Sequence, residues 1–532
     1  MNGMKGIGIV GRIANGSLVA LAAVLAVALA FGPAQAVVKK VPADFATIQA
    51  AVDDAASGDT IEIKKCTPFS TGVCGPNGEY HEDVEIFGKS LHILCKGAVL
   101  DGAPEDVDPG AQLFRGFNVH EDADGDADGT VIEGCTVQHF DNDGIHVGGS
   151  HVDDVIIKNN TAIGNERYGI FVIGDDCEVT GNTAISNDND GIRVGKNGGA
   201  VDGCLVEKNT AIGNDDDGIK VEGDNNIIRK NKAFRNDDEG IDVEGDKNLI
   251  SRNKVEANES RGIEVDGKDN TIERNKARAN ASHGIDVDNG NGNKVDRNTS
   301  NENQDDGFNI NGSDCDLATC GPITNNRAER NGDSGFDIDD FNGTSSKPIE
   351  VSGNKAKFNE DHGFECGLDS STCDFVNFKN NRADKNGNEG FNVCGTDITH
   401  TNDKAKRNAE DGFKHNTGCS HGTVWDNVKS LNNGQDGIDI DDTGTGFVVK
   451  NSTIKNNAGT GIENNGTDTE IDNNTVTGNR TDIAGEGDST DNCGSVAASS
   501  LPLDTTGGNT FKTGGATTRT ANTGPFDSHC QT

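Results

Sequence analysis

Residues Asn231-Lys-Ala-Phe-Arg-Asn236-Asp-Asp-Glu-Gly240-Ile-Asp-Val-Glu-Gly245 form a unit that returns 22 residues later as Asn253-Lys-Val-Glu-Ala-Asn258-Glu-Ser-Arg-Gly262-Ile-Glu-Val-Asp-Gly267. Aligned on the glycine before the Ile or Phe, the unit can be followed fourteen times, from Gly144 to Gly461, in steps of 22 to 28 residues. A repeat of this length predicts a solenoid, because one unit cannot bury its apolar side alone and must stack on its neighbours.

Each unit holds three short strand-like runs and no helical pattern. After the glycine, alternations such as Ile241-Asp-Val243 place two aliphatic side chains inward and one polar side chain outward. Asparagines recur at fixed offsets, as Asn231 and Asn236 do; Asn tolerates left-handed backbone at corners, and stacked amides can hydrogen-bond along the axis. We therefore predict an all-β chain: a single-stranded parallel β-helix of about 14–15 coils, right-handed by the general rule for parallel crossovers.

These repeats resemble those of right-handed parallel β-helix proteins of the pectate lyase-like superfamily, a group that includes polysaccharide lyases, epimerases, pectinesterases and NosD-like periplasmic proteins. The entry to the repeats fits as well. Residues 44–52 are predicted to form a short amphipathic helix that caps the open end, and residues 78–84 resemble a first coil. The Asp-Pro-His, Gly-His-Gly and Arg-Pro-Trp motifs of particular subfamilies are missing, so the resemblance implies a scaffold rather than one reaction.

The first 36 residues have the pattern of a secretory signal. Basic residues precede an apolar run from Leu18 to Phe31, and Ala34-Gln-Ala36 follows it, which predicts cleavage after Ala36. The run is too short and wrongly flanked for a membrane span. We expect a secreted, periplasmic or cell-surface protein without a membrane span.

The mature chain is expected to be one domain. Its predicted parts are the β-helix at 37–484, with an N-terminal cap and first coils at 41–101 and the repeats at 135–484, and a C-terminal cap or tail rich in Gly, Thr and Ser at 485–532.

Fourteen cysteines in an exported chain favour disulfides. Cys177 and Cys204 occupy the same column of the repeat and are expected one coil apart, where unpaired stacking in the core is the alternative. The other candidate pairs are Cys66 with Cys74, Cys315 with Cys320, and Cys493 with Cys530.

The formal net charge is −41, from 47 basic and 88 acidic residues. This balance argues against nucleic acid and anionic membrane surfaces, both of which require a basic patch. Cations are the natural partners, although an acidic surface can also be only an adaptation to solubility or high salt.

Outward positions after the glycine form a stripe along the solenoid, and three consecutive coils place carboxylates there. The predicted metal ligands are Asp242, Glu244, Glu264, Asp266, Asp286 and Asp288. Adjacent coils lie about 4.8 Å apart, so these charges repel one another, and Ca²⁺, which takes six to eight oxygen ligands, would relieve the repulsion. The same pattern also arises simply because outward positions are polar, as at Asp337-Ile-Asp339.

The resemblance implies candidate catalytic residues. In pectate lyases a similar acidic cluster binds Ca²⁺ and a nearby Arg or Lys removes the C5 proton of the uronate; by position, Arg261 takes that role here, and His283 is the chemically easier base. A second candidate patch is Tyr168 with Arg193, near Asp190, His146 and Asp143, a mixed set that loosely resembles the residue types of uronate epimerases and lyases.

Two classes of function follow. The first is a polysaccharide lyase or C5-epimerase that acts on acidic polysaccharide with Ca²⁺. The second is a non-catalytic surface or structural solenoid, a monomer in either case, that binds carbohydrate, cations or a protein partner. One Trp and two Tyr provide few aromatic faces for sugar binding. If the protein is an enzyme, we expect a cleft walled by insertions between Gly307 and Gly390. If it is a binding protein, we expect an open stripe along the solenoid.

Overall fold

The structure is a computed structural model. It describes residues 36–484, except 68–73, 104–112, 122–126, 150–151, 196–200, 289–291, 313–320, 369–370, 372, 420–421, 442–443 and 468. The predicted signal sequence before Ala36, the tail 485–532, and the candidate pairs Cys315–Cys320 and Cys493–Cys530 lie outside this part of the chain.

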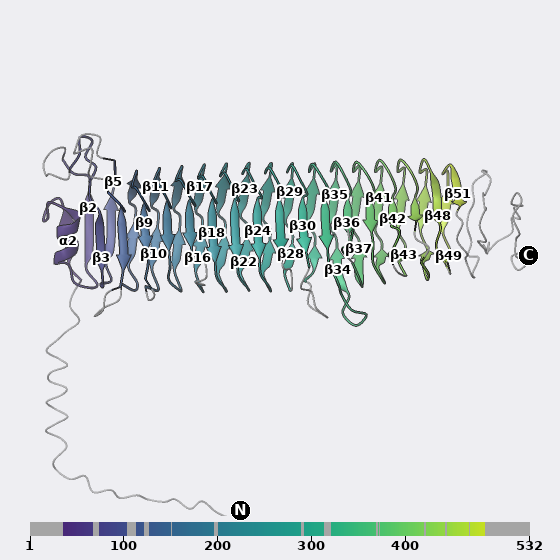
Figure 1. Cartoon of the computed structure of the whole chain (residues 1–532), viewed down its shortest axis with the longest axis horizontal. Coiled ribbons are helices and arrows are strands. Elements are labelled where there is room, and N and C mark those ends of the chain that lie inside the picture. The colour runs from purple at the N-terminus through teal and green to yellow at the C-terminus, as the bar shows by residue number, and fades with distance from the viewer. Residues whose placement is uncertain are drawn as a thin grey trace, which may run out of the picture.

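The chain winds into a long rod whose coils each contribute one strand to three parallel sheets (Figure 1). Sheet A has 18 strands, from β1 (Val38–Val41) to β49 (Glu470–Asp472), and sheet B has 16, from β5 (Val99–Asp101) to β50 (Thr475–Thr477). Sheet C runs from β3 (Val84–Phe87) to β51 (Thr481–Ala484). Each strand pairs with the equivalent strand of the next coil, so the prediction of an all-β parallel β-helix is confirmed. With 16 strands in sheet B, the number of turns slightly exceeds the predicted 14–15.

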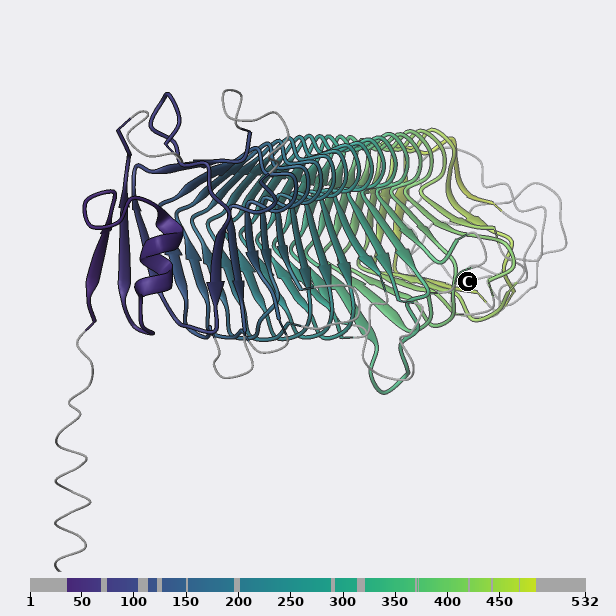
Figure 2. The same ribbon diagram turned by 60° about the vertical axis from the view of Figure 1, so that its left-hand side comes forward.

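The N-terminal end carries the one helix of the described residues. Helix α2 spans Ile48–Asp54, beginning later than the predicted start at Asp44, because the Thr47 hydroxyl accepts from the Ala50 N–H at 3.1 Å and sets the N-cap. The Glu82 carboxylate accepts from two further free N–H groups, those of Ile48 and Gln49. The helix lies beside the first strands (Figure 2).

The interior of the rod is filled by stacks of like side chains. Ile241 and Val243 of β21 (Ile241–Glu244) are fully buried, as the alternation predicted, and the equivalent residues of neighbouring coils pack above and below them. Further along, phenylalanines replace the isoleucine after the glycine. Phe308, Phe336, Phe364, Phe391 and Phe413 stack nearly parallel, with ring centroids 4.7–4.8 Å apart.

Two asparagine ladders hold the corners on either side of sheet B; the ladder through Asn236 is continuous, whereas the ladder through Asn231 passes from Asn381 to Asp403. In one, the Asn236 side chain donates to the Asn258 oxygen at 3.0 Å and Asn258 donates to Asn280 at 3.0 Å; in the other, Asn231 donates to Asn253 at 3.2 Å. The predicted axial hydrogen bonding is confirmed. The expectation of left-handed backbone at these asparagines is wrong, because it is the preceding residue, such as Arg235 (φ 55°) or Ala257 (φ 60°), that turns the corner.

Disulfides add covalent links between and within coils. Cys177–Cys204 joins adjacent coils and Cys66–Cys74 closes a short loop, as predicted. Three further pairs, which the sequence did not indicate, complete the set: Cys95–Cys135, Cys366–Cys373 and Cys394–Cys419. Among residues 36–484 as described, no helix is long and apolar enough to cross a membrane.

Removing one rung of a ladder tests its contribution to stability. In Asn258→Ala the buried N–H and amide of Asn236, which both donate to Asn258 at 3.1 and 3.0 Å, lose their acceptor. We expect the free energy of unfolding to fall by about 2 kcal/mol, measured by urea denaturation followed by circular dichroism. Asn225→Gly, at an exposed corner with φ 58°, is the control and should change little. Equal stability of the two variants would contradict the role assigned to the ladder.

Candidate functional site

The outer face of sheet C and the turn that precedes each of its strands form an acidic groove. Its central strands are β15 (Ile192–Val194), β18 (Ile219–Glu222), β21, β24 (Ile263–Asp266) and β27 (Ile285–Asp288). Each of these strands follows a repeat glycine whose missing side chain lets the coils approach. A Cβ at Gly240 would lie 2.5 Å from the Asn258 amide and 2.6 Å from the Gly262 carbonyl. Glycine therefore fixes the start of every strand in the groove.

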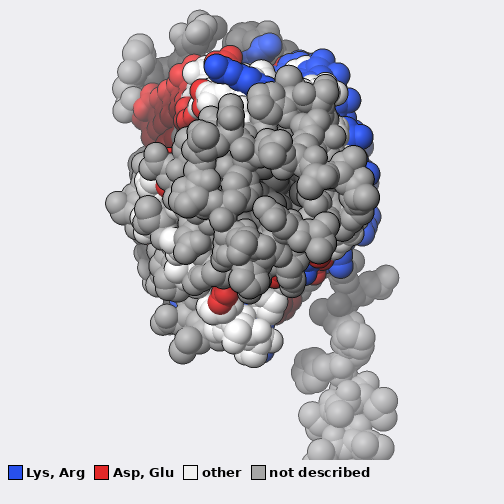
Figure 3. All heavy atoms as spheres, turned by 90° about the vertical axis from the view of Figure 1, so that its right-hand side faces the viewer, with Lys and Arg blue, Asp and Glu red and all other residues white. Residues whose placement is uncertain are grey.

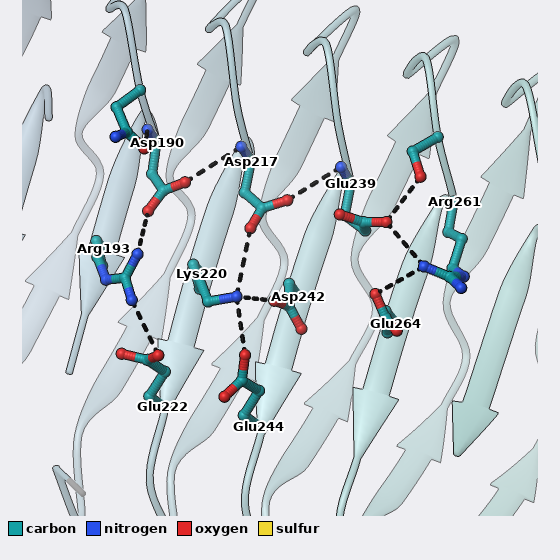
Figure 4. Close-up of polar contacts among 12 residues, drawn as sticks. Asp190, Arg193, Asp217, Lys220, Glu222, Glu239, Asp242, Glu244, Arg261 and Glu264 are labelled. Carbon is teal, nitrogen blue, oxygen red and sulfur yellow. Dashed lines mark hydrogen bonds and ion pairs between the residues drawn. The ribbon is translucent and has the colours of Figure 1, made fainter. Parts of the chain in front are cut away.

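The residue before each glycine is often acidic, and its carboxylate bridges coils. Asp190 accepts from the backbone N–H of Asp217 at 3.2 Å, and Asp217 accepts from the N–H of Glu239 at 3.0 Å (Figure 4). This carboxylate ladder runs parallel to the asparagine ladders. Sequence reasoning missed Asp217 and Glu239, although the recurrence of an acidic residue before the glycine was the available signal.

Three cations are interleaved with these carboxylates (Figure 4). Arg193 contacts Asp190 at 3.1 Å and Glu222 at 2.9 Å. Lys220 contacts Asp242 and lies 2.9 Å from Glu244, both on the next coil, and 3.8 Å from Asp217 on its own coil. Arg261 contacts Glu239 and Glu264, both at 3.2 Å, and also Asp286, at 2.5 Å. Each cation thus joins carboxylates of two or three adjacent coils.

These residues surround a shallow pocket of about 370 Å³. Eight carboxylates line it together with the three cations, so anionic groups remain in excess. The carboxylates belong to Asp216, Asp217, Asp238, Glu239, Asp242, Glu244, Glu264 and Asp266.

Burial raises the pKa of several groove carboxylates, because the ionised form loses its hydration and the nearby cations do not fully compensate for the loss. The pKa of Asp242 rises to about 6 against the opposing effect of Lys220. Burial likewise raises the pKa of Asp286 to about 6 and that of Glu264 to about 7, with Arg261 acting in the opposite direction. At Asp217, burial and the carboxylates of Asp190, Asp242 and Glu239 raise the pKa far above its usual range.

The six predicted metal ligands do not converge on one point. Lys220 holds Asp242 and Glu244, and Arg261 holds Glu264 and Asp286. The carboxylates of Glu264, Asp286 and Asp288 still bring ligand atoms within 4.8 Å of one another. Asp266 lines the pocket. Two more trios meet the same spacing around Asp217: one with Asp190 and Asp216, the other with Asp238 and Glu239. Carboxylate oxygens at such separations suit Ca²⁺.

The two residues predicted as bases are both held by carboxylates. Arg261 is bound by three of them, which raises its pKa although burial opposes this. His283 lies 3.2 Å from Asp306; burial lowers its pKa, but Asp306 and Asp286 outweigh that effect and raise it. Arg261 is therefore stabilised as a cation, which disfavours proton abstraction by its guanidinium.

The second predicted patch does come together on β9 (Ile145–Val147), β12 (Ile170–Val172) and β15. The guanidinium of Arg193 lies 5.5 Å from the centre of the Tyr168 ring. His146 Nδ1 lies 2.7 Å from the buried Asp143 carboxylate, and Phe171 packs between the His146 and Tyr168 rings at 5.1 and 4.9 Å. This arrangement brings together an oriented imidazole, a phenol and a guanidinium.

The family described as right handed beta helix region matches residues 122–270, 175–320 and 244–377. The chain is a right-handed parallel β-helix protein, as its repeats predicted. No curated protein matches it in sequence.

Solved structures that are similar to the chain include the periplasmic alginate epimerase AlgG, 15% identical over 56% of this chain and 75% of that one, with a TM-score of 0.34. The catalytic domain of a GH87 alpha-1,3-glucanase is 14% identical over 71% of this chain and 66% of that one, with a TM-score of 0.37. PfbA, a surface adhesin of Streptococcus pneumoniae, is 12% identical over 67% and 84%, with a TM-score of 0.34. Similarities of this size assign no activity.

The raised pKa values predict how stability depends on pH. Between about pH 4 and pH 7 the folded groove binds more protons than the unfolded chain does, so its contribution to stability is complete at low pH and is lost as pH rises through the folded pKa values. We expect Asp242→Asn/Asp286→Asn to show a smaller fall in thermal midpoint between about pH 5 and pH 7.5 than the parent, measured in EDTA. Identical slopes for parent and variant would contradict these pKa shifts.

Proposed function

We propose that this β-helix binds an acidic polysaccharide along sheet C, with a divalent cation, Ca²⁺, joining the groove carboxylates to the uronate groups. The observation that carries the proposal is the excess of carboxylates over cations in one pocket, with pKa values raised by burial. A groove in this state gains stability by binding a cation, because the ion replaces protons and relieves repulsion between coils.

The trio Glu264, Asp286 and Asp288 is the candidate to hold the ion, which would displace the Arg261 guanidinium from Glu264 and Asp286. Three carboxylates supply three to six of the six to eight oxygens that Ca²⁺ takes. The remaining positions are available to a carboxylate and hydroxyl groups of a sugar acid. The bound polysaccharide would then extend along the stripe that adjacent coils continue.

Binding is favoured over elimination at this groove for two reasons. Arg261 is held as a cation by its carboxylate partners, and His283 Nδ1 is engaged by Asp306. In addition, none of the described residues between Gly307 and Gly390 lines the pocket, so the predicted walls are not found there. An open stripe suits a protein that holds a chain rather than one that encloses a reacting sugar.

We propose that the protein functions outside the cytoplasm. All ten cysteines in the described part of the chain are paired, in five disulfides, as is typical of exported proteins. The signal pattern that ends at Ala36 is proposed to direct the export.

Calorimetry tests the cation site. Titration of Ca²⁺ into the mature protein should give saturable heat, which Glu264→Gln/Asp286→Asn/Asp288→Asn should remove, because the converging carboxylates are lost. The matched control Asp439→Asn/Asp441→Asn neutralises an equivalent outward pair on another coil and should retain binding. Calcium should also increase the retention of the parent on immobilised polygalacturonate, reversibly with EDTA. Saturable heat that persists in the triple variant would contradict this site.

A second candidate function, a uronate lyase or epimerase, is favoured by the patch at Tyr168. The Asp143 carboxylate holds His146 Nδ1 at 2.7 Å, which orients the ring for acid–base work at Nε2. Arg193, which already pairs with Asp190 and Glu222, would exchange one of these partners for a uronate carboxylate, and that contact would acidify the C5 proton. If His146 takes that proton, elimination breaks the C4–O bond and Tyr168 can protonate the departing oxygen; return of the proton to the other face gives the epimer.

This second function has its own measurement. Incubation with alginate or polygalacturonate should produce unsaturated uronates, detected by ultraviolet absorbance, or a changed epimer ratio, detected by proton NMR. His146→Gln and Tyr168→Phe should each reduce the rate at least about a hundredfold, with unchanged circular dichroism. Product formed equally by parent and both variants would exclude this patch as the site.

A further inference from the structure

The outer face of sheet B carries cations in register on eight of ten consecutive coils: three in a row from Lys232 to Lys276, then a gap at Thr299, then five in a row from Arg327 to Lys429. Facing residues of neighbouring strands pair as Lys232 with Lys254, Lys254 with Lys276, Lys355 with Arg382, Arg382 with Lys404, and Lys404 with Lys429. The strands are β20 (Lys232–Phe234), β23 (Lys254–Glu256), β26 (Lys276–Arg278), β29 (Thr299–Asn301), β32 (Arg327–Glu329), β35 (Lys355–Lys357), β38 (Arg382–Asp384), β41 (Lys404–Lys406), β44 (Lys429–Leu431) and β47 (Thr453–Lys455).

Charge on this face is opposite to that of the whole chain. The outward positions of these ten strands hold twelve cations and three carboxylates, whereas the chain has 47 basic and 88 acidic residues. Seen from the C-terminal end of the rod, Lys and Arg gather along one side of the molecule and Asp and Glu gather elsewhere (Figure 3). The twelve cations are Lys232, Lys254, Lys276, Arg278, Arg327, Lys355, Lys357, Arg382, Lys404, Lys406, Lys429 and Lys455.

The three carboxylates do not neutralise the column. Glu329 contacts Arg327, Asp384 contacts Arg382 at 2.6 Å, and Glu256 lies 2.5 Å from Lys254. Each of them is thus engaged by a cation of its own strand. Within the described residues, several cations of the column make no ion pair: Lys232, Lys276, Lys355, Lys404, Lys406, Lys429 and Lys455.

The cations are close enough to affect one another. Facing residues of adjacent coils lie about 4.8 Å apart at the backbone, and like charges directly opposite each other are destabilising. The pKa of Lys404 is lowered by burial and by the neighbouring charges of Arg382, Lys406 and Lys429. A shallow pocket of about 210 Å³ lies on the same face, lined in part by Arg327, Lys355 and Arg382. The face is therefore prepared for an anionic partner that extends along the rod.

We propose that a linear acidic polysaccharide binds along the outer face of sheet B through its carboxylate or sulfate groups, without a metal ion. This inference rests on the proposed function only for the class of ligand. Sheet C needs a bound metal ion to hold an anionic chain, whereas sheet B supplies the positive charge from its own side chains. Within the run from Arg327 to Lys429 one cation per coil repeats at about 4.8 Å, a length close to that of one sugar unit in an extended chain. Anionic groups of the polymer therefore meet successive cations along this run.

Other polyanions fit this face less well. Duplex DNA presents a phosphate about every 3.4 Å along each strand, which falls out of step with the coils. Single-stranded nucleic acid needs stacked aromatic platforms, and Phe234 is the one aromatic residue at the outward positions of these ten strands.

The test uses polygalacturonate as the probe, immobilised on a biosensor, with the mature protein in EDTA at low salt. Lys355→Gln/Lys404→Gln/Lys429→Gln removes three cations that have no ion pair to lose, and we expect affinity to fall about tenfold or more. The control Lys247→Gln/Lys347→Gln/Lys379→Gln removes three exposed cations from the corner before sheet A and from sheet A itself, and should leave affinity within about twofold. Salt should weaken the binding of the parent more than that of the sheet B variant.

The outcomes separate this inference from the proposed function. Undiminished binding by the sheet B variant in EDTA would overturn the inference, whatever happens at sheet C. EDTA-resistant binding that is lost only in that variant would support it, even if the calcium site fails. Tighter binding of single-stranded DNA than of polygalacturonate would overturn the choice of ligand. Sedimentation that shows self-association of the parent at low salt, and none for the sheet B variant, would also overturn the choice of a polysaccharide as the ligand.

Discussion

In-register stacking is the constraint on which the rest of this structure depends. Parallel strands of successive coils pair residue for residue, so each side chain lies directly above its equivalent in the next coil. Identical residues are favourable in such a stack when they attract one another: amides hydrogen-bond along the axis and phenylalanine rings lie face to face. The same geometry is unfavourable for like charges, because two of them about 5 Å apart repel by about 0.8 kcal/mol even at the dielectric constant of water.

The charged faces respond to this constraint differently. On sheet C, Arg193, Lys220 and Arg261 each bridge carboxylates of adjacent coils. Burial then raises the pKa values of the carboxylates that remain in excess. On sheet B the carboxylates pair with cations close to them, as Glu256 does with Lys254 and Arg278, and lysines such as Lys355 and Lys429 stay exposed. The first face is therefore suited to a cation and the second to an anion, although both are built from the same repeat.

Much of the architecture could be predicted from sequence because stacking makes each coil a copy of the last. The alternation Ile241-Asp-Val243 located the core, and the asparagine columns located two ladders. The left-handed residue was misplaced because any residue type can precede the ladder asparagine, so Arg235 and Ala257 leave no compositional signal. The Cys95–Cys135 disulfide was not predicted, because the first coils are irregular and their residues cannot be aligned with the columns of the repeat. In the groove, Glu264 and Asp286 were identified by counting from the glycine, but the ion pairs made by Lys220 depend on side-chain reach across coils, which counting does not provide.

Net charge is a poor guide to the partners of a solenoid. A value of −41 argues against polyanions only if the charge is spread evenly, since every approach would then meet the same field. Here the repeat sorts charge into columns, and at physiological ionic strength interactions between exposed charges are largely screened beyond about 8 Å. An anionic chain lying on Lys355, Lys404 and Lys429 is within that distance of the cations beneath it, whereas most of the carboxylates of sheet C face a different side of the rod. The local column, rather than the sum over the chain, therefore decides which ligand each face attracts.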